Sequence, residues 1–266
     1  MKKLLYSLAL LASLLSIFSC ERENKPGEPT DGKLVVSAVI SDWTAAKELP
    51  EGTAGEAGHI FHPEWKTGDK IIGYYNNGKA DVLLNYEVEE VANGTATFKK
   101  IGAFEEPGNG QAVYFAYAQG CEASALANGK LAISIKNQTK RAMPVVMGAA
   151  GVVLDGKLSL SFISITSVIG IKNPTLEGTA GSNISQLTLS GSGIVAEGTL
   201  DLKTAAFTPS TEKTYITKEV DQTEGDGTIL VSIFPEISSD LKLTVMQNGL
   251  EYSLLCPSLQ PAVNSY

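Results

Sequence analysis

The stretch Leu241-Lys242-Leu243-Thr244-Val245-Met246-Gln247-Asn248-Gly249-Leu250-Glu251-Tyr252-Ser253-Leu254-Leu255 holds two short apolar runs on either side of an Asn-Gly pair. In Leu241–Val245, apolar and polar residues alternate, which is the period of a half-buried β-strand. Asn-Gly accepts positive φ at both central positions of a type I′ turn, which matches the twist of the flanking strands. The stretch therefore predicts a β-hairpin with its tip at Asn248-Gly249.

Runs with the same alternation recur along most of the chain. In Asp81–Val91, the apolar residues from Val82 to Val88 fall on one face, and mostly polar residues fall on the other. Thr228–Phe234 is more continuously apolar and is closed by Pro235, which predicts a central strand buried on both sides. The other predicted strands are Leu34–Ile40, Ile71–Tyr75, Val113–Tyr117, Leu131–Ile135 and Leu158–Phe162.

Turn signals separate these runs. No window after the N-terminal region sustains apolar residues at helical spacing beyond about two turns. The sequence thus predicts an all-β fold in which sheets pack face to face. We expect hairpin tips at the Asn-Gly and Asp-Gly pairs, which begin at Asp31, Asn77, Asn93, Asn109, Asn128, Asp155, Asp226 and Asn248.

A glycine- and alanine-rich segment, 148–156, precedes a new series of strands and indicates a domain boundary. We expect one β-sandwich over residues 33–150 and a second over residues 151–266. Glu-Gly-Thr-Ala-Gly occurs at Glu51 and again at Glu177. This short repeat either marks equivalent loops of two related sandwiches or is a coincidence in a glycine-rich chain.

The N-terminus has the pattern of a secretory signal. Lys2 and Lys3 precede an apolar run that ends at Phe18, and Ser19 stands directly before Cys20. The run is shorter than the roughly 20 residues that a helix needs to cross a bilayer, so we expect residues 1–19 to be cleaved. The alternatives are an ordinary signal peptide in which Cys20 is incidental, or an uncleaved anchor.

The segment resembles bacterial lipoprotein signals. That resemblance implies cleavage between Ser19 and Cys20. It further implies that the Cys20 sulfur carries diacylglycerol through a thioether and that its amino group is acylated, for example by palmitate. Several acyl chains on one residue give stable attachment to a membrane. Residues 20–32 are polar and contain Pro26 and Pro29, so we expect a flexible tether. The predicted location is the cell outer membrane, with the folded part at the surface.

Composition limits the possible partners. Hydrophobic residues make up 43% of the chain, so a large core can form, and the net charge is −8 before the two lysines of the signal are lost. A chain this acidic repels phosphate backbones, which argues against nucleic acid as a partner. Cys121 and Cys256 either form a disulfide in an oxidising compartment or are independent buried thiols.

Four features, taken in order along the chain, resemble one family. They are the lipoprotein signal, the segment Trp65-Lys66-Thr67-Gly68-Asp69-Lys70-Ile71, the aromatic strand Val113–Tyr117, and Met147-Gly148 followed by Leu158–Phe162. Together they are similar to the fimbrillin-like (Mfa-like) surface lipoproteins of Bacteroidetes. From the residues themselves, Gly68-Asp69 predicts a tight turn, and Trp65 is large enough to fill one end of a sandwich. We interpret Trp65, Gly68 and Asp69 as structural.

The resemblance implies two tandem transthyretin-like β-sandwiches, a fimbrial structural or accessory subunit in adhesion, and assembly by strand donation between subunits. Host or bacterial surface ligands are further implied partners. Leu34–Ile40 would be the strand released, after cleavage at Lys47. The family's protease prefers arginine, however, and Arg22 and Arg141 are the only arginines. The chain also ends at Tyr266, where the family pattern would continue into another strand.

No residue constellation predicts catalysis, a cofactor or a metal site. His59 and His62 lack flanking acids that would complete a zinc site, and Asp221–Asp226 lacks EF-hand spacing. Glu89-Glu90 and Glu105-Glu106 are interpreted as solvated acids. The alternative function is a glycan-binding lipoprotein of a polysaccharide-uptake system, for which Trp43, Trp65, Tyr74 and Tyr75 are the candidate sugar-stacking residues.

Overall fold

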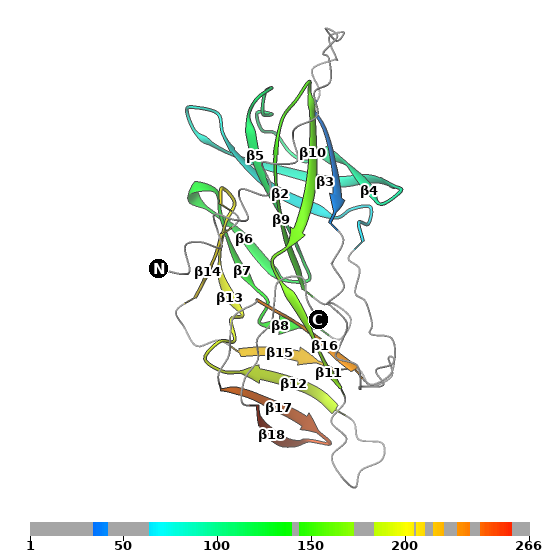
Figure 1. Ribbon diagram of the computed structural model, residues 1–266, viewed down its shortest axis with the longest axis vertical. Coiled ribbons are helices and arrows are strands. Elements are labelled where there is room, and N and C mark those ends of the chain that lie inside the picture. Colours follow the sequence, from blue (N-terminus) through cyan, green and yellow to red (C-terminus); the bar gives the residue numbers. More distant parts are fainter. Residues whose placement is uncertain are drawn as a thin grey trace, which may run out of the picture. The chain divides into compact units, whose positions relative to one another are not determined.

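The computed structural model describes residues 34–41, 64–139, 144–172, 184–204, 206–210, 215–220, 228–234 and 240–256. Its elements in these ranges are β-strands, apart from the 3-10 turn η1 at Ala127–Gly129 (Figure 1). The predicted all-β fold is confirmed. No helix in the described ranges is long and apolar enough to cross a membrane.

Seven strands form a closed barrel in the order β1-β10-β9-β5-β2-β3-β4. Their side chains alternate between the barrel interior and its outside, because successive residues of a strand point to opposite faces. In β10, for example, Leu158, Leu160 and Phe162 are buried and the residues between them are exposed. The bounds are β1 Val35–Ile40, β2 Lys70–Asn76, β3 Asp81–Ala92, β4 Thr95–Lys100, β5 Ala112–Gln119, β9 Val145–Val152 and β10 Lys157–Ser164.

The other described strands form three further sheets, in the orders β11-β16, β18-β17-β12-β15-β8 and β14-β13-β7-β6. A second hydrophobic cluster, with Leu187, Leu200 and Val231 among its fully buried members, joins these sheets. The bounds are β6 Glu122–Leu126, β7 Lys130–Ser134, β8 Asn137–Gln138, β11 Ser167–Lys172, β12 Ile184–Ser190, β13 Glu197–Asp201, β14 Ala206–Pro209, β15 Tyr215–Glu219, β16 Thr228–Ile233, β17 Leu241–Gln247 and β18 Leu250–Cys256.

The burial predicted for both faces of Thr228–Phe234 is confirmed, since Val231, Ser232 and Ile233 are all buried, but the predicted central position is wrong. In the described part of the chain, β16 pairs only with β11. On its other edge the buried side chain of Gln138 takes the place of a strand. Gln138 Nε2 donates to the carbonyl of Ser232 at 2.7 Å, and Gln138 Oε1 accepts from the Ser232 N–H at 3.0 Å. The apolar run therefore reflects burial between layers, and a side-chain amide satisfies the main chain there.

Four of the predicted hairpin tips are confirmed, since both residues of the pair have positive φ. They are the pairs at Asn93, Asn128, Asp155 and Asn248. The pair at Asn77 also lies at a hairpin tip, between the paired strands β2 and β3, but only its glycine has positive φ. The prediction is wrong at Asn109, which lies between β4 and β5, two strands that do not pair with each other. At Asn77, the side-chain oxygen instead accepts from the N–H groups of Lys79 and Ala80, which caps a wider turn. The pairs at Asp31 and Asp226 lie outside the described residues.

The barrel crosses the predicted domain boundary. β9 spans residue 150, and β10, which follows it, pairs with both β9 and β1. A division at residue 150 would separate strands of one sheet, whereas a division after Ser164 would leave the barrel whole. Two tandem domains remain a prediction.

Candidate functional site

The site that the structure offers is the place of β1 in the barrel. β1 lies between β4 and β10, which are distant from it in sequence (Figure 1). Val35–Ile40 pair in parallel with Lys157–Phe162, and Val36–Ala38 pair in the antiparallel direction with Phe98–Ala96. We call the space between β4 and β10 that β1 fills the β1 groove. β4 and β10, the two walls of the groove, are both hydrogen-bonded to the main chain of β1.

Alternate side chains of β1 enter the core. Leu34, Val36 and Ala38 are 7%, 0% and 2% exposed, whereas the outward-facing Val35 and Val39 are 52% and 40% exposed. This alternation confirms the strand predicted for Leu34–Ile40. A groove with main-chain bonds on two sides and a pocket for every second side chain has the features with which proteins bind an extended peptide by strand addition.

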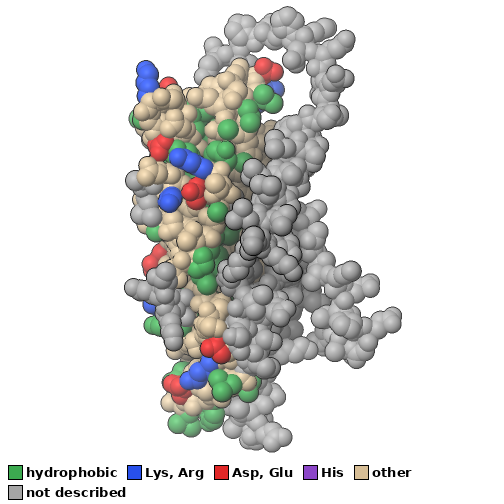
Figure 2. All heavy atoms as spheres, turned by 60° about the vertical axis from the view of Figure 1, so that its left-hand side comes forward, with side chains coloured by type: hydrophobic (Ala, Val, Ile, Leu, Met, Phe, Trp, Pro, Cys, Tyr) green, Lys and Arg blue, Asp and Glu red, His purple; other side chains and the backbone are tan. Residues whose placement is uncertain are grey.

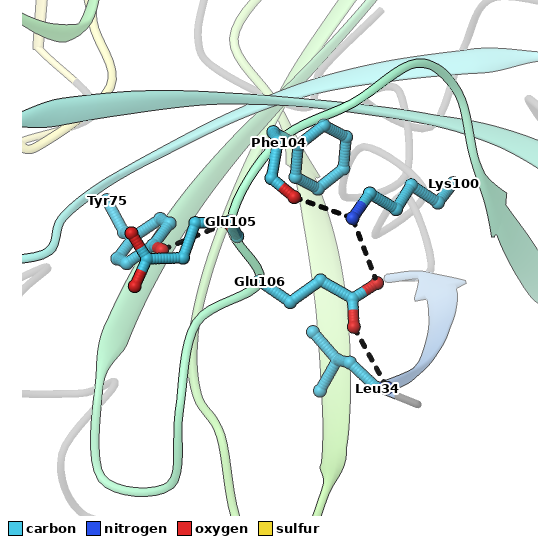
Figure 3. A network of polar contacts seen from close by, with 6 residues as sticks. All are labelled: Leu34, Tyr75, Lys100, Phe104, Glu105 and Glu106. Atoms are coloured by element: carbon cyan, nitrogen blue, oxygen red, sulfur yellow. Dashed lines mark hydrogen bonds and ion pairs between the residues drawn. The ribbon is translucent and has the colours of Figure 1, made fainter. Parts of the chain in front are cut away.

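A polar network holds the start of β1 (Figure 3). The N–H of Leu34 donates to Glu106 Oε2 at 3.3 Å, and Lys100 Nζ lies 3.8 Å from Glu106 Oε1. Lys100 also donates to the carbonyl of Phe104 at 2.6 Å and lies over the Phe104 ring. The side chain of Glu106 is 22% exposed, so the interpretation of Glu106 as a solvated acid is wrong. The loop after β4 is thereby hydrogen-bonded to Leu34, the residue directly before β1.

The Tyr75 hydroxyl supports the same loop, because it donates to the carbonyl of Glu105 at 3.0 Å (Figure 3). Burial raises the pKa of Tyr75, and the carboxylates of Glu105 and Glu106 raise it further, so this phenol stays a donor at neutral pH. At the other end of β1, the Ser41 N–H donates to the carbonyl of Phe162 at 2.9 Å, and the hydroxyls of Ser41 and Ser161 lie 2.6 Å apart. Both ends of β1 are therefore fastened to the barrel.

Trp65 packs against both walls of the β1 groove. Its ring centroid lies 5.4 Å from Phe98 of β4, 5.2 Å from Phe162 of β10 and 5.0 Å from Tyr117 of β5, each in an edge-to-face arrangement. Trp65 is 6% exposed, and its Nε1 has no hydrogen-bond partner among the described residues. An aromatic contact of this kind ties the walls together independently of β1.

Gly68 and Asp69 form the turn that leads from Trp65 into β2. Gly68 has φ +93°, which favours glycine, and the Asp69 N–H donates to the carbonyl of Lys66 at 3.0 Å. Asp69 Oδ2 in return accepts from the Lys66 N–H at 2.8 Å. Burial raises the pKa of Tyr117 far above its usual range, and the carboxylate of Asp69 raises it further. Trp65, Gly68 and Asp69 therefore all take part in packing or in the turn before β2.

The structure places the other candidate residues apart from this site. Cys121 is a free thiol whose pKa is raised to about 11, mainly by burial. The side chain of Cys256 is not among the described residues, nor are Ser19, Cys20 or Lys47. Among the residues that are described, no group of three or more His, Cys, Asp or Glu could hold a metal ion.

The candidate sugar-stacking residues are mostly inside the protein. Trp65, Tyr74 and Tyr75 are 6%, 3% and 1% exposed, and Trp43 lies outside the described ranges. Sugar platforms need exposed aromatic faces. Three of the four residues predicted for the glycan alternative therefore cannot stack on a sugar from solvent.

Sequence reasoning missed Lys100, Glu106 and the pairing of β1 with β10. The signal for Lys100 and Glu106 was weak, because a lysine near two acids is common on a surface. The parallel pairing joins residues about 120 positions apart, as in Val35 with Lys157. Alternation predicts that a strand exists but does not identify its neighbour.

Two solved structures share this fold. A structure described as a "putative cell adhesion protein" from Bacteroides uniformis ATCC 8492 is 18% identical, with a TM-score of 0.55, and the match covers 85% of each chain. A structure with the same description from Bacteroides ovatus ATCC 8483 is 14% identical, with a TM-score of 0.52, and the match covers 90% of this chain and 88% of that one. No family model and no curated protein matches the chain. The fold agrees with the resemblance to the fimbrillin-like lipoproteins of Bacteroidetes.

Proposed function

We propose that this protein is a lipid-anchored surface subunit of a fimbrial or adhesive structure, and that it binds a strand of a neighbouring subunit in the β1 groove. The role is one of assembly and adhesion, without catalysis. Cys20 carries the lipid that holds the chain at the outer membrane after cleavage behind Ser19. Cleavage at Lys47 then frees β1 together with the lipidated Cys20, and the incoming strand takes the place of β1. The lipid therefore anchors the uncut subunit, and neighbouring subunits hold the cut one.

The position of β1 is the observation that carries this proposal. β1 is covalently joined to the rest of the barrel through segment 42–63, while its bonds run to β4 and β10. If the segment is cut and β1 leaves, β4 and β10 both lose their hydrogen-bonding partner. The core positions that the side chains of Leu34, Val36 and Ala38 occupy become empty. Unpaired strand edges and empty side-chain pockets of this kind favour the binding of another extended strand.

Trp65 would help the barrel to stay folded after β1 has left. It contacts Phe98 and Phe162, one on each wall. It also lies beyond segment 42–63, so a cut at Lys47 leaves it attached to β2. The descriptions of the two structural neighbours as cell adhesion proteins support the same class of function.

A peptide-binding experiment tests the groove. A recognition sequence for a specific protease is placed within residues 44–50, and the protein is cut and exchanged against a fluorescent peptide of residues 33–41. We expect the cut protein to bind the peptide and the uncut protein not to bind it, because β1 fills the groove of the uncut protein. Fluorescence anisotropy measures the binding.

Two variant peptides with the same added charge provide the matched control. A peptide with Val36→Asp and Ala38→Asp places both charges in the core and should bind at least a hundredfold more weakly, since burying an unpaired charge costs several kcal/mol. A peptide with Val35→Asp and Val39→Asp places them outward and should bind within about threefold of the original. Equal binding of the two variant peptides, or no binding of the original peptide, would refute the proposal that the β1 groove binds an added strand.

A further inference from the structure

The edge strand β18 carries an apolar stripe that the fold leaves uncovered. Leu250, Tyr252 and Leu254 are 60%, 41% and 59% exposed. They lie directly opposite Gln247, Val245 and Leu243 of β17, which are 2%, 5% and 8% exposed. Directly opposite residues share a face, so the stripe continues the core-facing side of the sheet into solvent. Figure 2 shows hydrophobic side chains gathered at the lower end of the view, where Figure 1 has β17 and β18.

β18 lacks the devices with which proteins protect a sheet edge. Among the described residues it is the terminal strand of the order β18-β17-β12-β15-β8. It pairs with β17 over seven consecutive residues without a register shift, and Leu250–Cys256 contains no proline and no lysine. Edge strands that stay unpaired usually have a bulge, a proline or lysines.

The hairpin geometry fixes which main-chain groups face this edge. The two-residue turn Asn248-Gly249 makes Gln247 and Leu250 a hydrogen-bonded pair, and such pairs recur at every second residue. Leu250, Tyr252 and Leu254 therefore bond to β17. The N–H and C=O groups of Glu251, Ser253 and Leu255 point away from β17, toward the open edge.

We infer that this edge pairs with the same edge of a second copy of the protein, in the antiparallel direction, with Ser253 opposite Ser253 of the second copy. In that register Glu251 lies opposite Leu255 of the second copy, so the outward N–H and C=O groups form roughly six hydrogen bonds. On the core-facing side, Tyr252 lies opposite Leu254 of the second copy. The two stripes then lie side by side on one face and form a continuous apolar strip, with cross-strand contacts at the joint.

Charge favours a second copy as the occupant. Glu251 is the only charged residue of β18, and in this register it faces an apolar residue instead of its own counterpart. The exposed Lys242 of β17 lies opposite Leu255 on the same face. Glu251 of one copy and Lys242 of the other therefore lie on the same face, on either side of Leu255 and two strands (roughly 10 Å) apart. Opposite charges at this distance attract at low salt, and the pair occurs twice by symmetry, as in a two-fold dimer. This inference is independent of the β1 groove.

Sedimentation of the full chain with Cys20→Ser, which removes the lipid, tests the dimer. We expect a reversible monomer–dimer equilibrium in the micromolar range. Leu254→Glu should abolish the dimer, because it places two like-charged carboxylates in the joined stripes. Since Leu254 is exposed, its thermal unfolding should stay unchanged, which separates loss of pairing from loss of folding. A chain that stays monomeric at all concentrations would overturn the inference.

A charge exchange tests the register. Glu251→Lys alone and Lys242→Glu alone should each weaken the dimer by roughly tenfold at low salt, because each replaces two attractive pairs with repulsive ones. The double variant should restore the dimer to within about threefold. Absence of this rescue would overturn the register. A chain truncated after Cys256 that dimerises when the full chain does not would show that the chain's own tail occupies the edge, which also overturns the inference.

Discussion

Gly73 shows how closely the barrel core is packed at a single residue. It lies on β2 directly opposite Phe115 of β5, and a Cβ at this position would lie 2.3 Å from the Phe115 ring. Phe115 is 1% exposed, so the ring has little room to move. The absence of a side chain at residue 73 is what allows a phenylalanine in this layer of the barrel.

We predict that Gly73→Ala destabilises the protein by about 1–3 kcal/mol, the usual cost of overpacking a core. Gly108→Ala is the matched control, because its Cβ would meet only the end of the Gln111 side chain at 3.9 Å and its φ is not positive. Urea unfolding followed by circular dichroism measures both. Equal midpoints for the two variants would contradict the packing argument.

The buried hydroxyl of Tyr117 should make the free energy of unfolding depend on pH in alkaline solution. Burial and Asp69 hold its pKa in the folded protein far above the ordinary value of 10.0 that applies in the unfolded chain. Above pH 10 the unfolded chain loses a proton that the folded protein keeps. The free energy of unfolding is therefore fully retained below pH 10 and falls above it, by up to about 1.4 kcal/mol per pH unit for one such group.

We expect Tyr117→Phe to reduce this slope, although it lowers stability at neutral pH through loss of the bond to Asp69. Tyr215→Phe, at a side chain 45% exposed, is the control. The measurement is urea unfolding at several values between pH 8 and pH 11. A slope unchanged by Tyr117→Phe would show that other groups govern the alkaline transition.

At the scale of elements, Gln138 joins two sheets. It belongs to β8, the terminal strand of one sheet, and its side chain bonds both main-chain groups of Ser232 in β16. It is 1% exposed and also donates to the carbonyl of Ile135 at 3.2 Å. Without this amide, the buried N–H and C=O groups of Ser232 would lose these two hydrogen bonds.

We predict that Gln138→Ala lowers the free energy of unfolding by about 2–4 kcal/mol, because it leaves a buried N–H and C=O unsatisfied and opens a cavity. Asn137→Ala changes the exposed neighbour in the same strand and should cost less than about 0.5 kcal/mol. Chemical denaturation of both variants measures the difference. Hydrogen exchange should also become faster at the Ser232 amide.

Strands such as β9, β12 and β13 were not predicted. The strands with clear local alternation could be predicted, because this pattern depends only on neighbouring residues. Leu34–Ile40 and Leu241–Val245 follow this pattern, and both are strands. Neighbour relations depend on distant residues, so the parallel partner of β1 and the edge position of β16 could not be predicted. At the candidate site, Trp65 was recognisable by its size. Glu106 was not, because only the fold brings this acid to Leu34, directly before β1.

At the scale of the whole molecule, the proposed lipid on Cys20 would hold the uncut protein at the membrane. We predict that Cys20→Ser abolishes incorporation of labelled palmitate and moves the protein from the membrane fraction to the soluble fraction. The control is Ser7→Ala, within the predicted signal peptide, which should leave both unchanged. Labelled palmitate in the Cys20→Ser variant would contradict lipid attachment at this residue.

The covalent link through segment 42–63 makes the refilling of the barrel by β1 a first-order event. A tethered strand returns to its place at an effective concentration on the order of millimolar. A competing strand present at micromolar concentration loses by about a thousandfold, even if it fits equally well. A cut in this link would make the binding of both competitors bimolecular, and β1 would lose its advantage. In the proposed mechanism, strand exchange would therefore wait until one peptide bond of this segment is hydrolysed.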